Sequence, residues 1–178
     1  YGDPPYLHSF PTRRSSDLLK RGIPKERCES VAEHSFGVAL LALWLAKSHY
    51  SDLNIEKLVC MALLHDFGEV YAGDIIPADR INPSEKQQLE RESVRRVFEK
   101  LPGGEDLCLL WEEFEAGKTP EARLIKQLDR LEMGLQASVY RLQNLGNFEE
   151  FIQTSRQSLR DPILLDLLNQ ADNSQSSK

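Results

Sequence analysis

Apolar side chains recur at helical spacing along most of this chain. The pattern first runs from residue 31 to about residue 48, behind a Ser-x-x-Glu capping box formed by Ser30 and Glu33. The next segment, which ends near Gly68, shows the i, i+3, i+4, i+7, i+8 spacing of one helix face at Ile55, Leu58, Val59, Ala62 and Leu63. The two segments therefore predict two helices joined by a short polar break.

Five further helices are predicted in the second part of the chain, at residues 84–101, 107–114, 119–142, 148–158 and 162–170. The first begins at a capping box of Ser84 and Gln87, and the longest begins at Thr119-Pro120, an N-cap residue followed by proline. Residues 69–83 contain glycine and prolines and are predicted to form a turn and a surface loop. No alternating strand pattern stands out, so the predicted fold class is all-α, a helical bundle.

Both ends of the chain depart from this helical pattern. Residues 1–18 read YGDPPYLHSFPTRRSSDL without any helical or strand period, and residues 171–178 are polar, so disorder is predicted in both. The run HSFPTRRSSDL also resembles one reading frame of a short-read sequencing adapter. We therefore interpret residues 1–18 as a foreign segment joined to a truncated gene, and residues 19–170 as the folded domain.

Composition narrows the classes of function. The chain has 178 residues, of which 40% are hydrophobic and 28% charged, as expected for one globular domain. A net charge of -6 without a basic stripe argues against a nucleic acid polymer as partner, and the longest apolar run, residues 38–46, is too short to span a membrane. Three scattered cysteines argue against a disulfide framework and favour the reducing cytoplasm.

Two histidines and two aspartates on separate predicted helices can close around one divalent cation. His34 lies in the first turn of its helix, and His65 directly precedes Asp66 at the end of the next. Asp129 borders a broad apolar band in the longest helix, where a charge needs a partner such as a cation. Each residue alone also has an ordinary structural explanation. Together, two nitrogen and two oxygen donors leave coordination positions open for water and substrate.

The other histidines limit the site to one ion. His49 lies 15 residues after His34, roughly 22 Å along a helix at about 1.5 Å per residue, and is interpreted as a surface residue near a helix C-terminus. No histidine follows His65. Two-metal enzymes built on similar helices use additional downstream histidines for the second ion, so this resemblance implies a mononuclear site here.

The pattern H…HD…D on successive helices resembles that of the HD-domain metal-dependent phosphohydrolases. The surrounding segments ESVAEHS, LLHDFGEVYAGDI, PADRI, LWEEFEAG and EARLIKQLDRLEM are similar to the 5'-deoxynucleotidase branch of that family. The resemblance implies an all-α homodimer that removes phosphate from deoxyribonucleoside 5'-monophosphates. It also implies metal ligands and catalytic acids at six positions: His34, His65, Asp66 and Asp129 for the metal, and Glu69 and Asp74 for catalysis.

The two acids have distinct expected roles. Glu69 lies four residues after His65, so a continuing helical turn places it on the same side, where it can accept a proton from the attacking water. Asp74 follows the flexible Gly73 and can turn inward to assist the leaving 5' oxygen. Without the resemblance, Glu69 is equally well a surface acid and Asp74 a turn-forming aspartate.

The segment around Arg21 departs from the family pattern. Arg21 is a candidate for substrate binding because guanidinium pairs bidentately with phosphate, or it is one solvated charge among several basic neighbours. Family members begin with another helix and a tryptophan-containing loop just before this position. Here residues 1–18 replace both, and Leu18 stands where the tryptophan is expected. The domain is thus expected to lack the usual first helix and to have reduced activity or stability.

Two other functions stay open at the level of the sequence. One is a different HD-type activity, on a cyclic nucleotide or a dNTP, although no dense cationic pocket for a triphosphate stands out. The other is a non-catalytic regulatory module with a structural metal, but structural zinc sites are closed and four-coordinate, unlike a site with Glu69 and Asp74 beside it. The donor set suits Mn, Co, Fe, Zn or Mg, so it leaves the metal undetermined.

Overall fold

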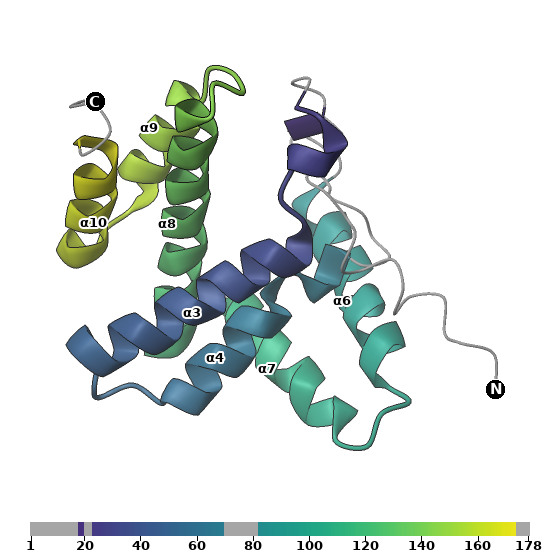
Figure 1. The fold of residues 1–178 in the computed structure, drawn as a ribbon. Helices are drawn as coiled ribbons and strands as arrows, with labels where there is room; N and C mark the ends of the chain where they lie inside the picture. Colours follow the sequence, from purple (N-terminus) through teal and green to yellow (C-terminus); the bar gives the residue numbers. More distant parts are fainter. Residues whose placement is uncertain (1–17, 20–22, 70–81, 174–178) are drawn as a thin grey trace.

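The helical prediction is confirmed by the computed structural model, which describes residues 18–19, 23–69 and 82–173 (Figure 1). These residues form a helical bundle and contain no strand. The elements are η1 Lys25–Arg27, α3 Val31–His49, α4 Ile55–Leu64, η2 His65–Gly68, α6 Pro83–Phe98, α7 Gly104–Ala116, α8 Pro120–Leu142, α9 Glu149–Ser158 and α10 Pro162–Asn173.

Helices α3 and α4 pack side by side as a hairpin (Figure 1). The predicted capping box opens α3: the backbone N–H of Ser30 donates to Glu33 at 2.7 Å, and the N–H of Glu33 donates back to the Ser30 hydroxyl at 3.2 Å. At the start of α4, the Asn54 side chain accepts the Lys57 N–H at 3.0 Å. Both helices thus begin where local capping chemistry directs them.

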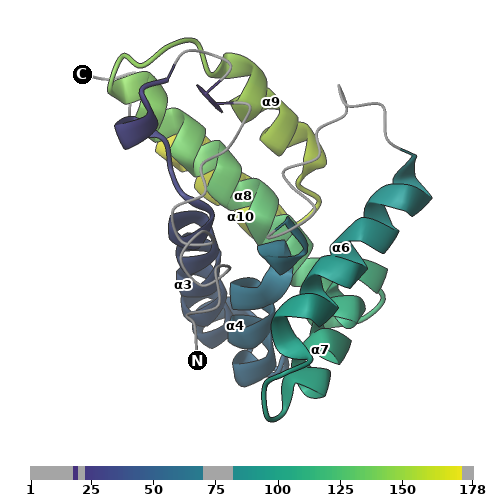
Figure 2. The same ribbon diagram turned by 90° about the vertical axis from the view of Figure 1, so that its right-hand side faces the viewer.

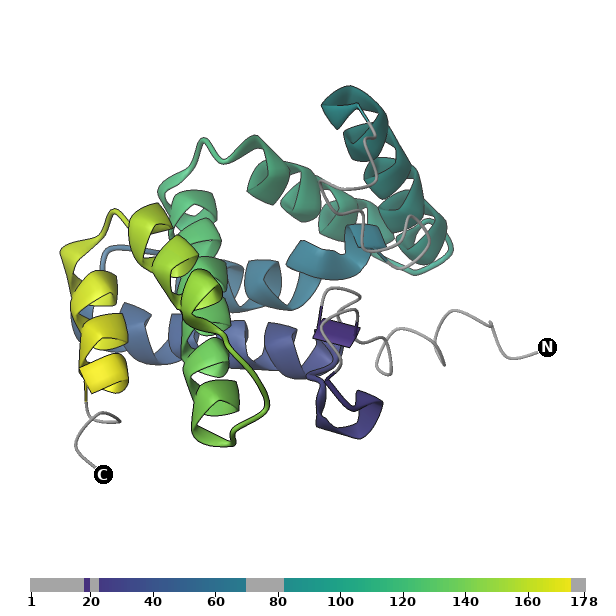
Figure 3. The same ribbon diagram turned by 90° about the horizontal axis from the view of Figure 1, so that it is seen from above.

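The long helix α8 is the centre of the molecule. Its buried face contacts α3, α4 and α7 on one side and α9 and α10 on the other. Seen from above, α9 and α10 lie at one end of the molecule and α6 lies at the other (Figure 3). Gly134 allows α9 to approach closely, because an added Cβ would lie 2.9 Å from Cβ of Ser155 in α9. The main core joins these helices through apolar side chains that are at most 1% exposed, among them Val38, Leu45, Leu58, Met61, Ile125, Leu128, Leu131, Leu164 and Leu168.

Helices α6 and α7 form a second pair beside this core (Figure 2). Trp111, Val94 and Phe98 bury against Leu64 in a cluster of their own. The start of α6 differs from the prediction: Asn82 is the N-cap and accepts the Ser84 N–H at 3.0 Å, and Pro83 fills the first turn.

The C-terminal ends of two helices also differ from the prediction. Helix α6 ends at Phe98, so Leu101 is 51% exposed, and Gly103 with φ of 73° turns the chain into α7. Helix α10 continues to Asn173 and includes three residues that we predicted to be disordered. Residues 1–17 and 174–178, with Arg21 and Asp74, lie outside the described residues. Among the described residues, none of the helices is long and apolar enough to cross a membrane.

Candidate metal centre

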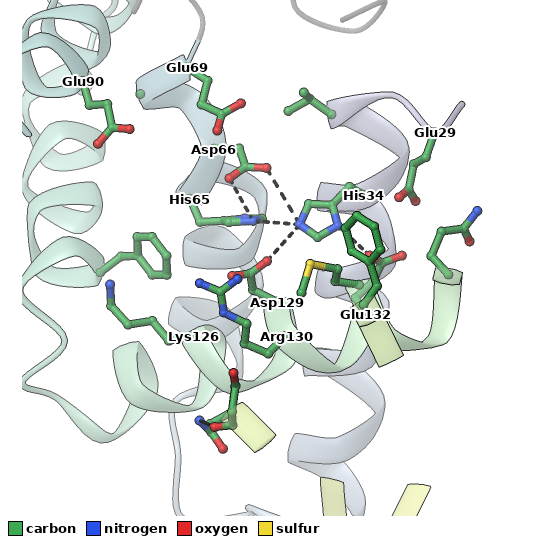
Figure 4. Close-up of a pocket in the computed structure, with 18 of the residues that line it drawn as sticks. Glu29, His34, His65, Asp66, Glu69, Glu90, Lys126, Asp129, Arg130 and Glu132 are labelled. Atoms are coloured by element: carbon green, nitrogen blue, oxygen red, sulfur yellow. Dashed lines mark hydrogen bonds and ion pairs between the residues drawn. The ribbon is translucent and has the colours of Figure 1, made fainter. Parts of the chain in front are cut away.

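Three separate elements bring His34, His65, Asp66 and Asp129 together (Figure 4). His34 Nε2 lies 3.2 Å from His65 Nε2, 3.3 Å from an Asp129 oxygen and 3.8 Å from an Asp66 oxygen. His65 Nε2 lies 3.3 Å from the other Asp66 oxygen. The gathering of these four side chains agrees with the arrangement expected from the sequence.

Helix α4 ends at Leu64, and the chain continues as the tighter 3-10 turn η2, which carries His65 and Asp66. In a 3-10 turn, residues i and i+3 lie one above the other. Glu69 therefore follows Asp66 on the same face, and its carboxylate points into the pocket above Asp66 (Figure 4). Trp111 fixes the turn by donating its indole N–H to the His65 carbonyl at 3.1 Å. Gly68 lets the turn approach α6, since an added Cβ would lie 2.9 Å from Glu90.

Hydrogen bonds at the far side of each ring determine which imidazole nitrogen faces the centre. His65 Nδ1 donates to the Ala62 carbonyl at 2.6 Å, and His34 Nδ1 donates to a Glu132 oxygen at 2.6 Å. In neutral imidazoles both Nε2 atoms then carry lone pairs, which face each other and two carboxylates. Such a convergence of acceptors is stable only with a proton or a cation among them.

The donor spacing also fits a single cation. Nitrogen and oxygen ligands lie about 2.0–2.2 Å from a zinc ion, which places neighbouring ligands of one ion about 3–3.6 Å apart. The distances among the Nε2 and carboxylate atoms, from 3.2 to 3.8 Å, overlap this range; His34, His65 and Asp66 form the compact group of ligand atoms, and Asp129 approaches it at His34. The residues present therefore have the chemistry and spacing to hold a divalent metal.

The electrostatics of the cluster show the same excess of acceptors. Burial would lower the pKa of His34, but hydrogen bonds to Asp129 and Glu132 raise it well above 6.5. Burial would raise the pKa of Asp129, whereas its hydrogen bond with His34 brings it below 3.8. Burial and the nearby Glu132 raise the pKa of Glu29 to about 8. The site thus favours positive charge at its centre.

A cavity of about 1060 Å³ surrounds the cluster, at the upper end of the roughly 300–1,000 Å³ typical of small-molecule sites. One wall comes from α6 and α7 and includes Glu90 and Trp111. The opposite wall comes from α8 and α9 and includes Gln136, Tyr140 and Phe151. The four residues of the candidate metal centre line the same cavity, so a small molecule bound in it can contact them.

Sequence reasoning missed Glu132, and its signal was present. Glu132 is only 8% exposed, and it lies within the apolar stripe of α8, between Leu128 and Leu135. A carboxylate at such a position needs a polar partner. Lys126 and Arg130, on the same helix, also line the cavity and were not singled out. His49 is the exposed last residue of α3, as predicted.

Residues 12–166 match the HD domain family. The chain belongs to this family. The matched range includes part of the segment that we interpreted as foreign, and that interpretation stays a prediction.

Similar proteins support the assignment of this HD domain. The chain is 35% identical to 5'-deoxynucleotidase HDDC2 of Bos taurus over 83% of the chain and 72% of that protein. It is 33% identical to 5'-deoxynucleotidase HDDC2 of Dictyostelium discoideum over 90% of both proteins. The crystal structure of PH0347 protein from Pyrococcus horikoshii OT3 is similar, with a TM-score of 0.75 and 29% identity over 94% of this chain and 95% of that chain. Both the sequence similarity and the structural similarity extend over most of the chain.

Proposed function

We propose that this HD domain hydrolyses deoxyribonucleoside 5'-monophosphates to deoxynucleoside and phosphate. The observation that carries the proposal is the convergence of His34, His65, Asp66 and Asp129 in a cavity large enough for a nucleotide. Relatives named 5'-deoxynucleotidase, at 33–35% identity over most of the chain, support the substrate class.

The proposed cofactor is one divalent metal held by His34, His65, Asp66 and Asp129. When bound, such an ion neutralises phosphate charge and lowers the pKa of water. Mn, Co, Fe, Zn and Mg are all compatible with two nitrogen and two oxygen donors. The second possible group of ligands, Glu29, His34 and Glu132, shares His34 with the first and presents its other ring nitrogen. One ion on the Nε2 side is therefore the simpler assignment.

Glu69 is the proposed proton acceptor for the attacking water. Its position one 3-10 turn after Asp66, with the carboxylate in the cavity, supports this role (Figure 4). Asp74 is proposed to assist the leaving 5' oxygen and Arg21 to bind the phosphate. Both lie outside the described residues, so these two roles rest on the family resemblance.

A phosphate-release panel tests the substrate class. The chain is assayed with deoxynucleoside and ribonucleoside monophosphates, dNTPs and cyclic nucleotides, each with Mn²⁺, Co²⁺ or Mg²⁺. The proposal predicts turnover of the deoxynucleoside monophosphates above all others. Preference for a dNTP or cyclic nucleotide would identify another HD-type activity, and metal binding without turnover of any substrate would favour a regulatory module.

Glu69→Gln tests the proton acceptor within the same assay. We expect turnover of dAMP to fall by about 10²–10⁴-fold, the usual contribution of a positioned acid or base, with metal content unchanged. Metal content is measured by atomic emission on the purified variant. Normal turnover by this variant would show that another group accepts the proton.

We propose a cytoplasmic location, supported by three free cysteines. We also propose that the protein forms a homodimer. The dimer is supported by an exposed apolar row along one face of α3, formed by Phe36, Leu40, Leu43 and Trp44. Trp44, 50% exposed, has the largest side chain of this row, so a charge at this position should disrupt the contact. Light scattering should give twice the chain mass for the parent protein and a monomer for Trp44→Glu, whereas equal masses would exclude this face.

A further inference from the structure

The two histidines of the candidate metal centre are held by different kinds of partner. His65 follows the last turn of α4, where backbone carbonyls lack helical partners, and its Nδ1 donates to one of them, the Ala62 carbonyl. His34 lies in the first turn of α3, where the groups without partners are N–H donors. Its Nδ1–H therefore needs an acceptor from outside its own helix.

Glu132 supplies that acceptor from α8. Its Oε2 lies 2.6 Å from His34 Nδ1, and the residue is 8% exposed. It follows Asp129 by three residues, so one face of α8 offers a carboxylate to each side of the His34 ring (Figure 4). Its negative charge also lies near the N-terminus of α3, where the helix dipole is favourable.

Helix α3 packs closely against the Glu132 carboxylate. Gly37 lies one turn after His34 on α3, and an added Cβ would lie 3.0 Å from Glu132 Oε1 and 3.2 Å from its Cγ. The glycine thus allows α3 and α8 to approach until the carboxylate is confined between Gly37 and the His34 ring. Confinement and a short hydrogen bond together restrict the rotation of both side chains.

We propose that Glu132 is a positioning residue that accepts the His34 Nδ1–H and thereby directs His34 Nε2 at the metal. This inference rests on the metal site of the proposed function and adds a residue to it. A carboxylate behind a ligating histidine fixes the ring orientation and increases the basicity of the ligand, and its loss commonly weakens metal binding 10–100-fold. Glu132 does not touch the metal or the substrate in this role.

Cobalt binding without substrate tests the inference. Glu132→Leu removes the acceptor, and Glu132→Gln keeps a carbonyl oxygen that can accept the same hydrogen bond. We expect the Co²⁺ dissociation constant, followed by visible absorption, to rise about 10–100-fold in the leucine variant and less than about tenfold in the glutamine variant. Circular dichroism melts verify that both variants are folded. Similar affinities for Glu132→Leu and the parent chain, or equally weak binding by both variants, would overturn the inference.

Glu29 provides a matched control. It lies in the same cluster, with a ligand atom within 4.8 Å of those of His34 and Glu132. Glu29→Gln should change the Co²⁺ dissociation constant by less than about threefold, since a 10–100-fold loss requires that the hydrogen bond to the ligating ring is removed. A loss as large as that of Glu132→Leu would indicate a general dependence on the polar cluster, not on the bond to the ring, and would overturn the proposed role. Failure of the parent chain to bind Co²⁺ would instead overturn the metal site itself, together with this inference.

Discussion

Helix α8 carries two charged clusters with different balances, one near its middle and one near its C-terminus. Near its middle, Asp129 and Glu132 flank His34, and Asp66 approaches from η2. Hydrogen-bond acceptors there outnumber the positively charged groups that the protein itself supplies. Near its C-terminus, Arg141 pairs with Asp172 of α10, which Arg156 of α9 also contacts at 2.7 Å. Two guanidinium groups there contact the Asp172 carboxylate, and Arg141 also pairs with Glu149 at 3.2 Å.

This difference separates a binding site from a structural contact. The Asp172 cluster contains its own positive charge and needs nothing from solution to satisfy its carboxylate. In the His34 cluster, the Nε2 atoms of two imidazoles face each other and carboxylate oxygens of Asp66 and Asp129, so a cation is needed to satisfy these acceptors. The balance of donors and acceptors within each cluster therefore predicts which one takes a ligand.

The largest expected effect comes from removing one of the convergent acceptors. Asp129→Asn keeps the side-chain shape but removes the charge that faces His34 Nε2 at 3.3 Å. A metal ion contributes several kcal/mol to transition-state stabilisation, so turnover of dAMP should fall by about 10³-fold or more. Arg156→Ala, in the self-contained cluster, should leave turnover within about threefold of the parent value, since distant sites act independently. Phosphate release measures both, and equal losses would remove the distinction between the clusters.

Much of this comparison could be predicted from the sequence, and the rest depends on tertiary contacts. Helical periodicity placed Asp129 on the border of an apolar band, and the HD pair identified His65 and Asp66. Glu132 was missed because spacing along one helix does not reveal which ring nitrogen of His34 on another helix faces it. The 3-10 turn at His65 was also missed, since it depends on packing against Trp111.

The C-terminal cluster shows a different limit of sequence reasoning. Asp172 belongs to a polar segment that composition alone assigns to a disordered tail. Arg141 and Arg156, distant in sequence, bind its carboxylate and extend α10 to Asn173. Such long-range pairing has no local pattern from which it could be read.

A smaller effect is expected from metal addition. If the first cluster binds a cation only when folded, a concentration about 100 times the dissociation constant stabilises the protein by about 2.7 kcal/mol. For a chain of this size, that corresponds to a rise in melting temperature of about 5–10 °C. Arg156→Ala should show the same rise with Mn²⁺ or Co²⁺, and Asp129→Asn a much smaller one. A chelator should reverse it; an equal rise in all three proteins would indicate nonspecific metal binding.

The smallest expected effect concerns Asp172 and its dependence on pH. Burial would raise the pKa of this carboxyl, but the hydrogen bonds from Arg156 and Arg141 hold it below its ordinary value of 3.8. Since the folded pKa is the lower one, the stabilisation is fully present above pH 3.8 and is lost as the pH falls through the folded pKa. Asp172→Asn should therefore reduce the free energy of unfolding by about 1–2 kcal/mol at pH 7, because partly exposed charged hydrogen bonds contribute on this scale.

Urea unfolding at pH 7 and at successively lower pH measures the difference between the two proteins, which should narrow only below about pH 4. The same variant should retain dAMP turnover and its response to metal, because its charge is matched within the protein and lies in the cluster that needs no external ion. A constant difference down to the acid limit would mean that Asp172 acts through packing, and the contrast between the two clusters of α8 would then rest on the metal centre alone.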